Sequence, residues 1–280
     1  VHAFWADEPG LIAVLSASVL RVPAVVSFQG GELVGFEDLQ YGLQLLRGRP
    51  TLIRFVARRA AMLTACSGYL RKLAQQWLPQ RLAGKVGYAT LGVDLERFHT
   101  MPATTAVRDD WTRVLSVGSL YPVKQHALAI DVIARVPRTR LTIVGRGPLE
   151  DALRAHAQRL GVDERVSLAG ARDHVDMPSV YRSADVFLHT SRHEAHCTAV
   201  LEAAASHVPV VGTPVGVIPD VGVAAVGVDA LADAVERLAR RPEARQELAA
   251  RAFERTRHEY SLVAAAAQHE GIYARVRART

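Results

Sequence analysis

Short apolar runs and longer helical segments alternate along most of the chain. Residues 184–190 contain Val186 and Phe187 in a short apolar run, which is typical of a buried strand. Residues 198–205 are rich in Ala, Leu and Glu, which favour a helix. The expected strands are 22–28, 63–66, 85–91, 112–117, 141–144, 166–168, 184–190 and 208–211, and the expected helices are 10–21, 54–62, 68–77, 125–135, 149–160, 177–183 and 198–205. This alternation predicts βαβ units with parallel sheets, an α/β fold.

The same pattern divides the chain into segments. Residues 101–110 are polar, contain a proline and lack periodicity, so they are interpreted as a linker. We therefore expect an N-terminal domain at 1–105 and a C-terminal domain at 106–258. Residues 229–279 read as almost wholly helical, with breaks at Pro242 and at Tyr260-Ser261. The last segment, 259–280, is accordingly expected to be a separate helix.

Two glutamates, Glu194 and Glu202, are separated by seven residues within a strand–loop–helix–strand pattern. Glu194 is expected in the loop at the carboxyl end of a strand, and Glu202 about two turns into the next helix. In open α/β sheets this crevice is where ligands bind. Solvated charge is the alternative interpretation of the pair.

Glycine turns follow three of the expected strands. Gly118 to Lys124 places a lysine near the end of one turn, where backbone N–H groups and an ammonium can face one anion. Gly145-Arg146-Gly147-Pro148 lacks the third glycine of a dinucleotide motif and reads as a tight strand-to-helix turn. Gln29-Gly30-Gly31-Glu32 is a third such turn. An ordinary turn or a solvated lysine is the alternative at each.

These motifs resemble those of the retaining GT-B glycosyltransferases, especially glycosyltransferase family 4. The two glutamates are followed by Ala203 and, after four residues, by Val-Pro-Val-Val-Gly-Thr, as in the family's signature. Residues 92–98, Gly-Val-Asp-Leu-Glu-Arg-Phe, are similar to the family's segment before the interdomain linker. The resemblance implies two Rossmann-like domains with a C-terminal helix that crosses back to the first. It also implies that the N-terminal domain is incomplete, with its first two or three βα units absent.

The resemblance assigns roles to particular residues. Glu194 would contact the transferred sugar, Glu202 the ribose, and Lys124 the donor diphosphate. It implies Glu194 and Lys124 as catalytic residues; Ser119, Lys124, Gly145, Arg172, His196, Cys197, Thr198 and Glu202 as donor-binding residues; and Gln29, Gly30 and Gly31 as acceptor-side residues.

The chain departs from the family's pattern at several places, one of which is Leu91, where an asparagine is usual. Ser119 replaces an arginine that holds the diphosphate, and Ala195-His196-Cys197 replaces Gly-Phe-Gly. Asp220 stands where a glutamate is usual. With serine at position 119, one positive charge is missing beside the leaving diphosphate. The bulkier residues at 195–197 reshape or crowd the sugar pocket.

The amino-acid composition limits the class of protein and the cofactors that are expected. The chain of 280 residues is 49% hydrophobic but has no apolar run of eighteen residues, which indicates a globular and not a membrane-spanning protein. Two cysteines make neither a disulfide framework nor a zinc cluster, which fits a cytoplasmic location. His193-Glu194-Ala195-His196 lacks the zincin spacing, and no Asp-x-Asp occurs, so no metal is expected.

The net charge of +6 permits anionic partners. We expect no nucleic-acid partner. A basic helical face allows peripheral association with an anionic membrane, on its inner side; this face comprises Arg54, Arg58, Arg59, Arg71 and Lys72.

The function that the resemblance implies is transfer of a sugar from a UDP- or GDP-linked donor with retention of configuration. The acceptor is a glycan, a lipid or a small molecule, and no further cofactor is required. Two alternatives remain open. One is a nucleotide-sugar epimerase of the same fold, and the other is a truncated or degenerate relative that binds a sugar nucleotide without catalysis.

Overall fold

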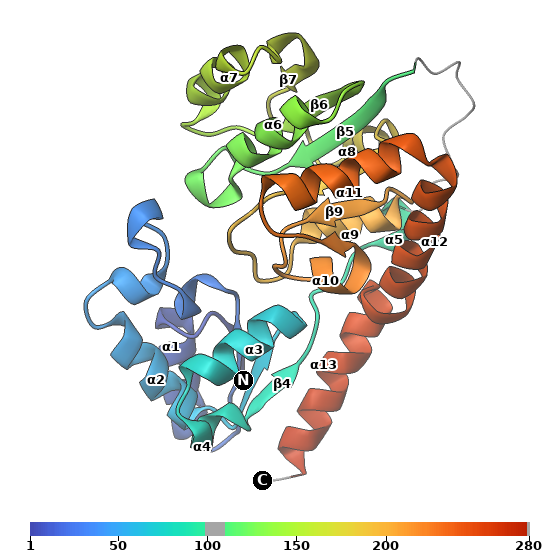
Figure 1. The fold of residues 1–280 in the computed structure, drawn as a ribbon. Coiled ribbons are helices and arrows are strands. Elements are labelled where there is room, and N and C mark those ends of the chain that lie inside the picture. The colour runs from blue at the N-terminus through green and yellow to red at the C-terminus, as the bar shows by residue number, and fades with distance from the viewer. Residues whose placement is uncertain (99–109, 279–280) are drawn as a thin grey trace. The chain divides into compact units, whose positions relative to one another are not determined.

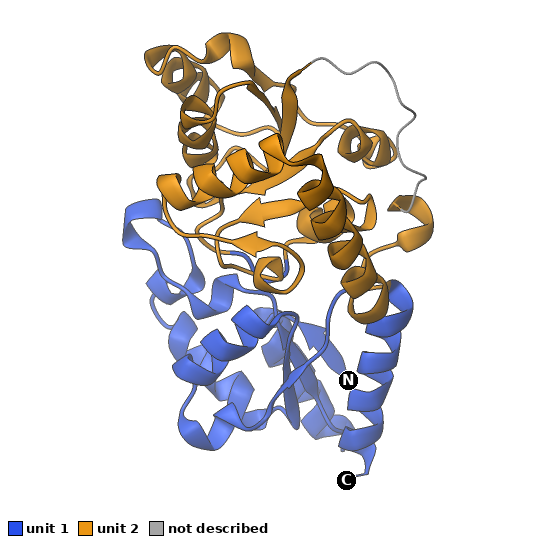
Figure 2. Ribbon diagram, turned by 45° about the vertical axis from the view of Figure 1, so that its right-hand side comes forward, with its two compact units in different colours: residues 1–92, 194–196, 262–280 blue, residues 93–193, 197–261 orange. Residues whose placement is uncertain are grey.

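The computed structural model describes residues 1–98 and 110–278, which form two compact units. Unit 1 comprises Val1–Gly92, Glu194–His196 and the C-terminal segment from Leu262. Unit 2 comprises Val93–His193 and Cys197–Ser261 (Figure 2). The predicted boundary at 105 lies outside the described residues, and so does the predicted linker at 101–110 except for its last residue. Both stay predictions.

Unit 1 is built on a parallel sheet of order β1-β2-β3-β4. Its strands are β1 (His2–Phe4), β2 (Val25–Phe28), β3 (Met62–Ala65) and β4 (Val86–Tyr88). Its helices are α1 (Glu8–Leu20), α2 (Arg49–Arg59), α3 (Gly68–Trp77), α4 (Gln80–Ala83) and α13 (Leu262–Arg277), with 3-10 turns η1 (Gly31–Leu33), η2 (Glu37–Leu39) and η3 (Leu43–Leu45) (Figure 1).

Neighbouring residues of β2 point to opposite faces of this sheet. Val26 packs in the main core of the unit with Ile53 of α2 and Leu70 of α3. Val25 instead packs against Ile272 and Val276 of α13. The last helix of the chain therefore closes the second face of the sheet in unit 1.

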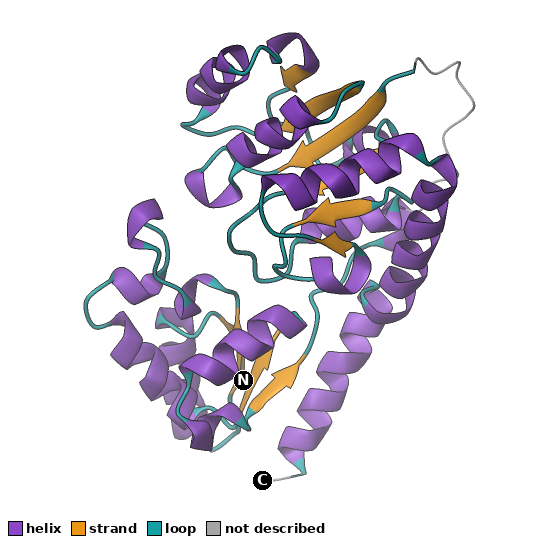
Figure 3. Cartoon of the chain, in the orientation of Figure 1, coloured by secondary structure: helices purple, strands orange, loops and turns teal. Residues whose placement is uncertain are grey.

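Unit 2 is a doubly wound six-stranded parallel sheet of order β10-β9-β8-β5-β6-β7 (Figure 3). Its strands are β5 (Thr112–Val117), β6 (Thr139–Val144), β7 (Val166–Leu168), β8 (Val186–His189), β9 (Val210–Gly212) and β10 (Val223–Ala224). Its helices and 3-10 turns are α5 (Leu95–Phe98), η4 (Pro122–Lys124), α6 (His126–Arg135), α7 (Glu150–Arg159), η5 (Asp163–Arg165), α8 (Met177–Arg182), α9 (Thr198–Ala205), α10 (Ile218–Val221), α11 (Val228–Arg240) and α12 (Pro242–Glu259).

The chain runs outward from β5 to β7 and then returns to place β8 on the other side of β5. Val114 and Leu188, on these two strands, share a core with α6, α7 and α11. Phe187 points to the opposite face, where its ring lies 5.8 Å from that of Tyr181 on α8. The winding direction reverses between β5 and β8, and ligands of doubly wound folds bind at the carboxyl ends of such strands.

The α/β class and the parallel sheets expected from the sequence are confirmed, and several elements match closely. Strands 112–117 and 166–168 and helix 198–205 have the expected bounds. Ser67 is the N-cap of α3, because its Oγ accepts the N–H of Leu70 at 3.0 Å.

Other bounds differ from the prediction. Strand 22–28 begins only at Val25. The helix expected from 54 begins at Arg49, because Gly48 adopts φ 83° and Pro50 stands in the first turn. The turns η1 to η3, helix α10 and strand β10 were not predicted, since each is too short to show a period. No helix in the described ranges is both long and apolar enough to cross a membrane.

Candidate functional site

The loops that follow β5 and β8 are joined at the carboxyl edge of the unit 2 sheet. The buried hydroxyl of Thr190 lies 3.2 Å from the carbonyl of Lys124 and donates to that of Gln125 at 2.9 Å. The N–H of Arg192 donates to the carbonyl of Val123 at 2.8 Å. Lys124 is therefore held on a turn that two strands support, at the reversal point of the sheet.

The side chain of Lys124 lies over the glycine turn after β5. A Cβ built on Gly118 would stand 3.5 Å from Cδ of Lys124, which places the lysine stem against that turn. Beneath the turn, Nε2 of His126 donates to the Gly118 carbonyl, and its Nδ1 faces Oγ of Ser116, both at 3.3 Å. Burial lowers the pKa of His126 to about 4, so its ring is neutral at pH 7. His126 thus supports the turn without adding charge beside Lys124.

The glycine turns after β5 and β6 pack backbone against backbone. The N–H of Leu120 donates to the carbonyl of Arg146 at 3.0 Å. A Cβ on Gly145 would stand 1.9 Å from the Gly118 carbonyl oxygen, and one on Gly147 would stand 2.6 Å from that of Leu120. No side chain fits at either position. The Gly-x-Gly pattern therefore allows a close approach of two turns that both end at the carboxyl edge.

Glu202 is nearly buried, with both carboxylate oxygens hydrogen-bonded. The hydroxyl of Tyr181 donates to Oε2 at 2.7 Å, and Nε2 of His174 donates to Oε1 at 3.0 Å. Burial and the charge of Glu202 raise the pKa of Tyr181 well above its usual value, so its hydroxyl stays protonated. Neither partner was singled out from the sequence as a contact of Glu202, because no local pattern links α8 and its preceding loop to a residue beyond β8.

The amino end of α9 begins with an unusual backbone conformation. Cys197 is the N-cap of this helix, with φ 71° in the left-handed region that favours glycine. Its Sγ lies 3.7 Å from Nε2 of His189, and both side chains are buried. Thr198, the first residue of the helix, is exposed. The backbone angle explains why the resembling family usually has glycine at this position.

The segment Glu194–His196 is assigned to unit 1. Nε2 of His196 lies 2.6 Å from Oγ1 of Thr90, and burial lowers the pKa of His196 to about 4. Ser67 donates to the Ala195 carbonyl, and the charge of Glu194 is one of the causes, after burial, that raise the pKa of Tyr41. His196 is therefore a neutral ring bound within unit 1.

The acceptor-side candidates form a turn around a buried carboxylate. Gly30 adopts φ 116°, which requires glycine. Glu32 is fully buried and accepts the N–H groups of Ala6 and Gln29, each at 3.1 Å. Burial raises the pKa of Glu32. The turn of Gln29, Gly30 and Gly31 is thus organised by Glu32, which ties the ends of β1 and β2 together.

The sequence-predicted residues therefore fall into two sets. Ser119, Lys124, Gly145, Arg172, Cys197, Thr198 and Glu202 belong to unit 2, whereas Gln29, Gly30, Gly31, Glu194 and His196 belong to unit 1. Ser119 and Arg172 are exposed, on the loops after β5 and β7. The absence of a metal site stays a prediction.

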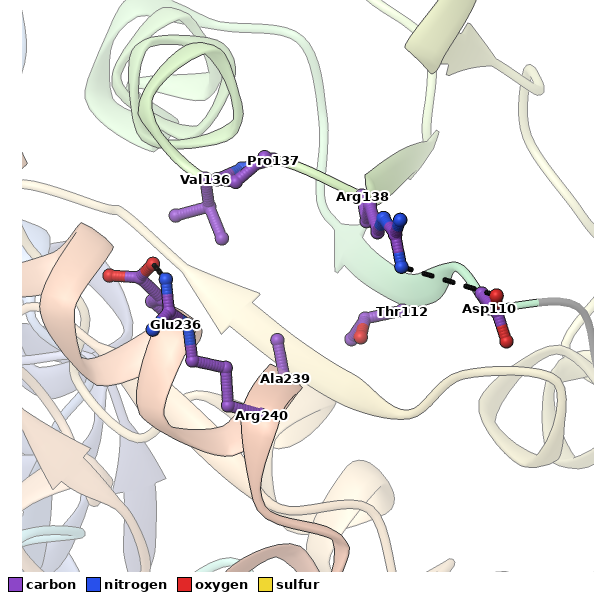
Figure 4. Close-up of a pocket in the computed structure, with 8 residues that line it drawn as sticks. All are labelled: Asp110, Thr112, Val136, Pro137, Arg138, Glu236, Ala239 and Arg240. Atoms are coloured by element: carbon purple, nitrogen blue, oxygen red, sulfur yellow. Dashed lines mark hydrogen bonds and ion pairs between the residues drawn. The ribbon is translucent and has the colours of Figure 1, made fainter.

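A cavity of about 390 Å³ lies elsewhere in unit 2 (Figure 4). Thr112 at the start of β5, Arg138 just before β6 and Arg240 at the end of α11 line it. It opens at the amino ends of the strands, away from the glycine turns. None of the sequence-predicted site residues lines this cavity, so it is not a candidate for the predicted ligand site.

Residues 99–255 match the family described as glycosyl transferases group 1, which is more than half of the chain. The chain belongs to this family. One relative is the GDP-mannose-dependent alpha-mannosyltransferase of Mycobacterium tuberculosis, 30% identical over 208 residues, which are 72% of this chain and 51% of that protein. Another is the D-inositol 3-phosphate glycosyltransferase of Mycobacterium sp. strain KMS, 32% identical over 139 residues, which are 46% of this chain and 31% of that protein.

Solved structures show the same fold. Sucrose-phosphate synthase from Thermosynechococcus elongatus superimposes with a TM-score of 0.84 at 20% identity, over 100% of this chain and 74% of that chain. Anabaena HepE, in a complex with UDP, gives a TM-score of 0.82 at 18% identity, over 98% and 78% of the two chains. This group 1 chain therefore has the GT-B fold that its motifs implied. It spans about half the length, or less, of the two mycobacterial relatives.

Proposed function

We propose that this chain carries the donor-binding machinery of a retaining glycosyltransferase that uses a nucleoside diphosphate sugar. The observation that carries the proposal lies within unit 2. Lys124 and Glu202 follow β5 and β8, the adjacent strands between which the winding reverses. A cation and a hydroxyl acceptor at that edge match a ligand with a diphosphate at one end and a ribose at the other. The names of the Mycobacterium tuberculosis mannosyltransferase and the HepE–UDP complex support such a donor.

The residues divide the chemistry between binding and leaving-group stabilisation. When the bond from the sugar to the diphosphate breaks, negative charge grows on the diphosphate. The ammonium of Lys124 and the N–H groups of the Gly118 turn would face that charge. Glu202 would accept the ribose hydroxyls, and Glu194 would contact the transferred sugar. No step in this scheme requires a metal ion.

Calorimetric titration with UDP and GDP tests donor binding. Glu202→Ala is expected to weaken binding about 10- to 100-fold, because it removes a buried acceptor for the ribose. Lys124→Gln is expected to weaken the binding of the nucleoside diphosphates much more than the binding of uridine or guanosine. Glu164→Ala, on η5, is the matched control and should leave both affinities unchanged. Binding of neither nucleotide, or equal binding by wild type and Glu202→Ala, contradicts the proposal.

Turnover of a sugar nucleotide tests the reaction. Incubation of UDP- and GDP-sugars with a panel of glycans and lipids is expected to give a product whose anomeric configuration, measured by NMR, equals that of the donor. Glu194→Ala should bind nucleotide normally but lose transfer. An inverted product refutes retention. Conversion of the donor to its epimer without acceptor identifies an epimerase, and binding without turnover identifies a non-catalytic relative.

We also propose a membrane-facing location for the chain, on the cytoplasmic side. Arg58 and Arg59 at the end of α2, and Arg71 and Lys72 on α3, are exposed in unit 1. Basic clusters of this kind bind anionic headgroups. Co-sedimentation with vesicles containing phosphatidylserine is expected, and it should weaken as salt is raised. Equal sedimentation with neutral phosphatidylcholine vesicles contradicts an electrostatic attachment.

A further inference from the structure

The two oxygens of the Glu202 carboxylate stand in different surroundings. Oε2 meets the hydroxyl of Tyr181, a side chain with no exposed surface. Oε1 meets the ring of His174, whose side chain is 58% exposed and lies on the loop between β7 and α8. One oxygen is therefore fixed from inside the unit, and the other is held by a surface residue.

Tyr181 is itself held rigidly. Its ring packs against those of Phe98, at 5.9 Å, and Phe187, at 5.8 Å. A buried phenol that donates to a carboxylate satisfies that oxygen and fixes the plane of the group. The orientation of Glu202 is thereby set before any ligand arrives, which is the arrangement expected of a pre-organised acceptor.

His174 has fewer contacts. Its ring lies 5.6 Å from that of Phe98 and donates to Oε1 of Glu202. It follows Arg172 and Asp173, which are also exposed. An exposed ring on a loop can rotate away at small cost, whereas Tyr181 cannot.

We propose that Tyr181 is a positioning residue for Glu202, and that His174 is a displaceable latch that holds the oxygen which the ribose hydroxyls would use. This inference rests on the proposed donor site. A ribose diol that places both of its hydroxyls on Oε1 takes the place of the His174 N–H, because this oxygen has two lone pairs. The latch therefore reduces the apparent affinity by the fraction of molecules in which it is closed.

The test compares UDP with 2′,3′-dideoxy-UDP, which has the same base and diphosphate but no ribose diol. The readout is the ratio of their dissociation constants, measured by calorimetry for the whole chain. His174→Ala is expected to bind UDP about 3- to 10-fold more tightly, the value of one exposed hydrogen bond. Its affinity for the dideoxy analogue should not change. His174→Gln keeps an N–H donor and is the matched control, with affinities near wild type.

Tyr181→Phe removes the hydroxyl alone. It is expected to weaken the binding of UDP about 5- to 20-fold and to leave the affinity for the dideoxy analogue unchanged. The ratio of the two dissociation constants therefore falls toward one. A merely structural defect would weaken both ligands equally. Thermal unfolding of each variant confirms that it is folded.

The outcomes separate the inference from the proposed function. If the wild type binds neither UDP nor GDP, the donor site itself is refuted; if only GDP binds, the same comparison is made with GDP and 2′,3′-dideoxy-GDP. If UDP binds but His174→Ala binds it more weakly, His174 is a ligand contact and the latch is refuted. If Tyr181→Phe weakens both nucleotides to the same extent, Tyr181 has no specific role in positioning Glu202.

Discussion

The hydroxyl of Thr190 donates a hydrogen bond to the main-chain carbonyl of Gln125 at 2.9 Å, across the edge where β5 and β8 end. Gln125 adopts φ 48° and is the residue through which the chain enters α6. The bond therefore fixes a left-handed residue directly after Lys124. The loop after β8 thus helps to fix the conformation of the turn from Gly118 to Lys124, which is distant along the sequence.

Thr190→Val should destabilise the protein and loosen that turn. The substitution keeps the shape of the side chain but removes the hydroxyl that donates to the Gln125 carbonyl, which then keeps only the N–H of Leu128 at 2.9 Å. Loss of this hydrogen bond costs about 1 kcal/mol in the free energy of unfolding. Nucleotide affinity should fall as well, because Lys124 loses its support. Denaturant unfolding and UDP titration measure the two effects. Thr190→Ser keeps the hydroxyl and should resemble wild type; if Ser and Val variants behave alike, the hydroxyl has no such role.

Substitutions at Cys197 should depend on backbone conformation more than on size. Its φ of 71° is disfavoured for side chains branched at Cβ. Cys197→Val is expected to cost about 1–3 kcal/mol of stability, from strain in the left-handed region. Cys197→Gly should stay within about 1 kcal/mol of wild type, since relief of strain offsets the loss of the buried thiol. Chemical denaturation measures both, and a well-tolerated valine would contradict this account.

His126 should make the protein less stable in mild acid. Burial lowers its pKa from 6.5 to about 4, so below pH 6.5 the unfolded chain takes up a proton that the folded chain excludes. The contribution is fully present above pH 6.5 and is lost as the pH falls toward 4, by about 2 kcal/mol between pH 7 and pH 5. His126→Gln retains an N–H donor for the Gly118 carbonyl but cannot titrate.

Denaturant unfolding of wild type and His126→Gln at a series of pH values checks this prediction. The stability curve of the variant should fall less steeply between pH 7 and pH 5. His2 and His196, whose pKa values are also lowered to about 4 by burial, add to the slope in both proteins. Parallel curves for the two proteins would show that His126 is not responsible.

Ser119→Arg should strengthen diphosphate binding. Ser119 is exposed on the turn that carries Lys124, at the position where the resembling family has arginine. A guanidinium there adds a charged group that donates two hydrogen bonds to phosphate oxygens. It should raise the affinity for UDP about 3- to 10-fold at low salt. Ser119→Gln controls for size without charge. The gain should shrink as ionic strength rises, and an unchanged UDP affinity in the arginine variant would place the diphosphate away from this turn.

Much of the architecture was predictable because its causes are local. The bounds of β5, β7 and α9 follow from short apolar runs and helix formers, and the cap of α3 follows from Ser67. No secondary structure was predicted for residues 31–45, because 3-10 turns of three residues have no detectable period. The site residues were singled out by the resemblance of their motifs to the family's pattern, and their roles stay predictions.

What the sequence by itself determined is the order of strands and helices and the identity of the side chains at the ends of β5 and β8, since periodicity and turn residues act over a few neighbours. Tertiary structure alone decided which groups meet. It gave Glu202 its partners Tyr181 and His174, placed Thr190 against Gln125, and turned the last helix onto β2. These contacts join segments that are distant along the chain, and their free energy depends on how the sheets wind and bury their faces.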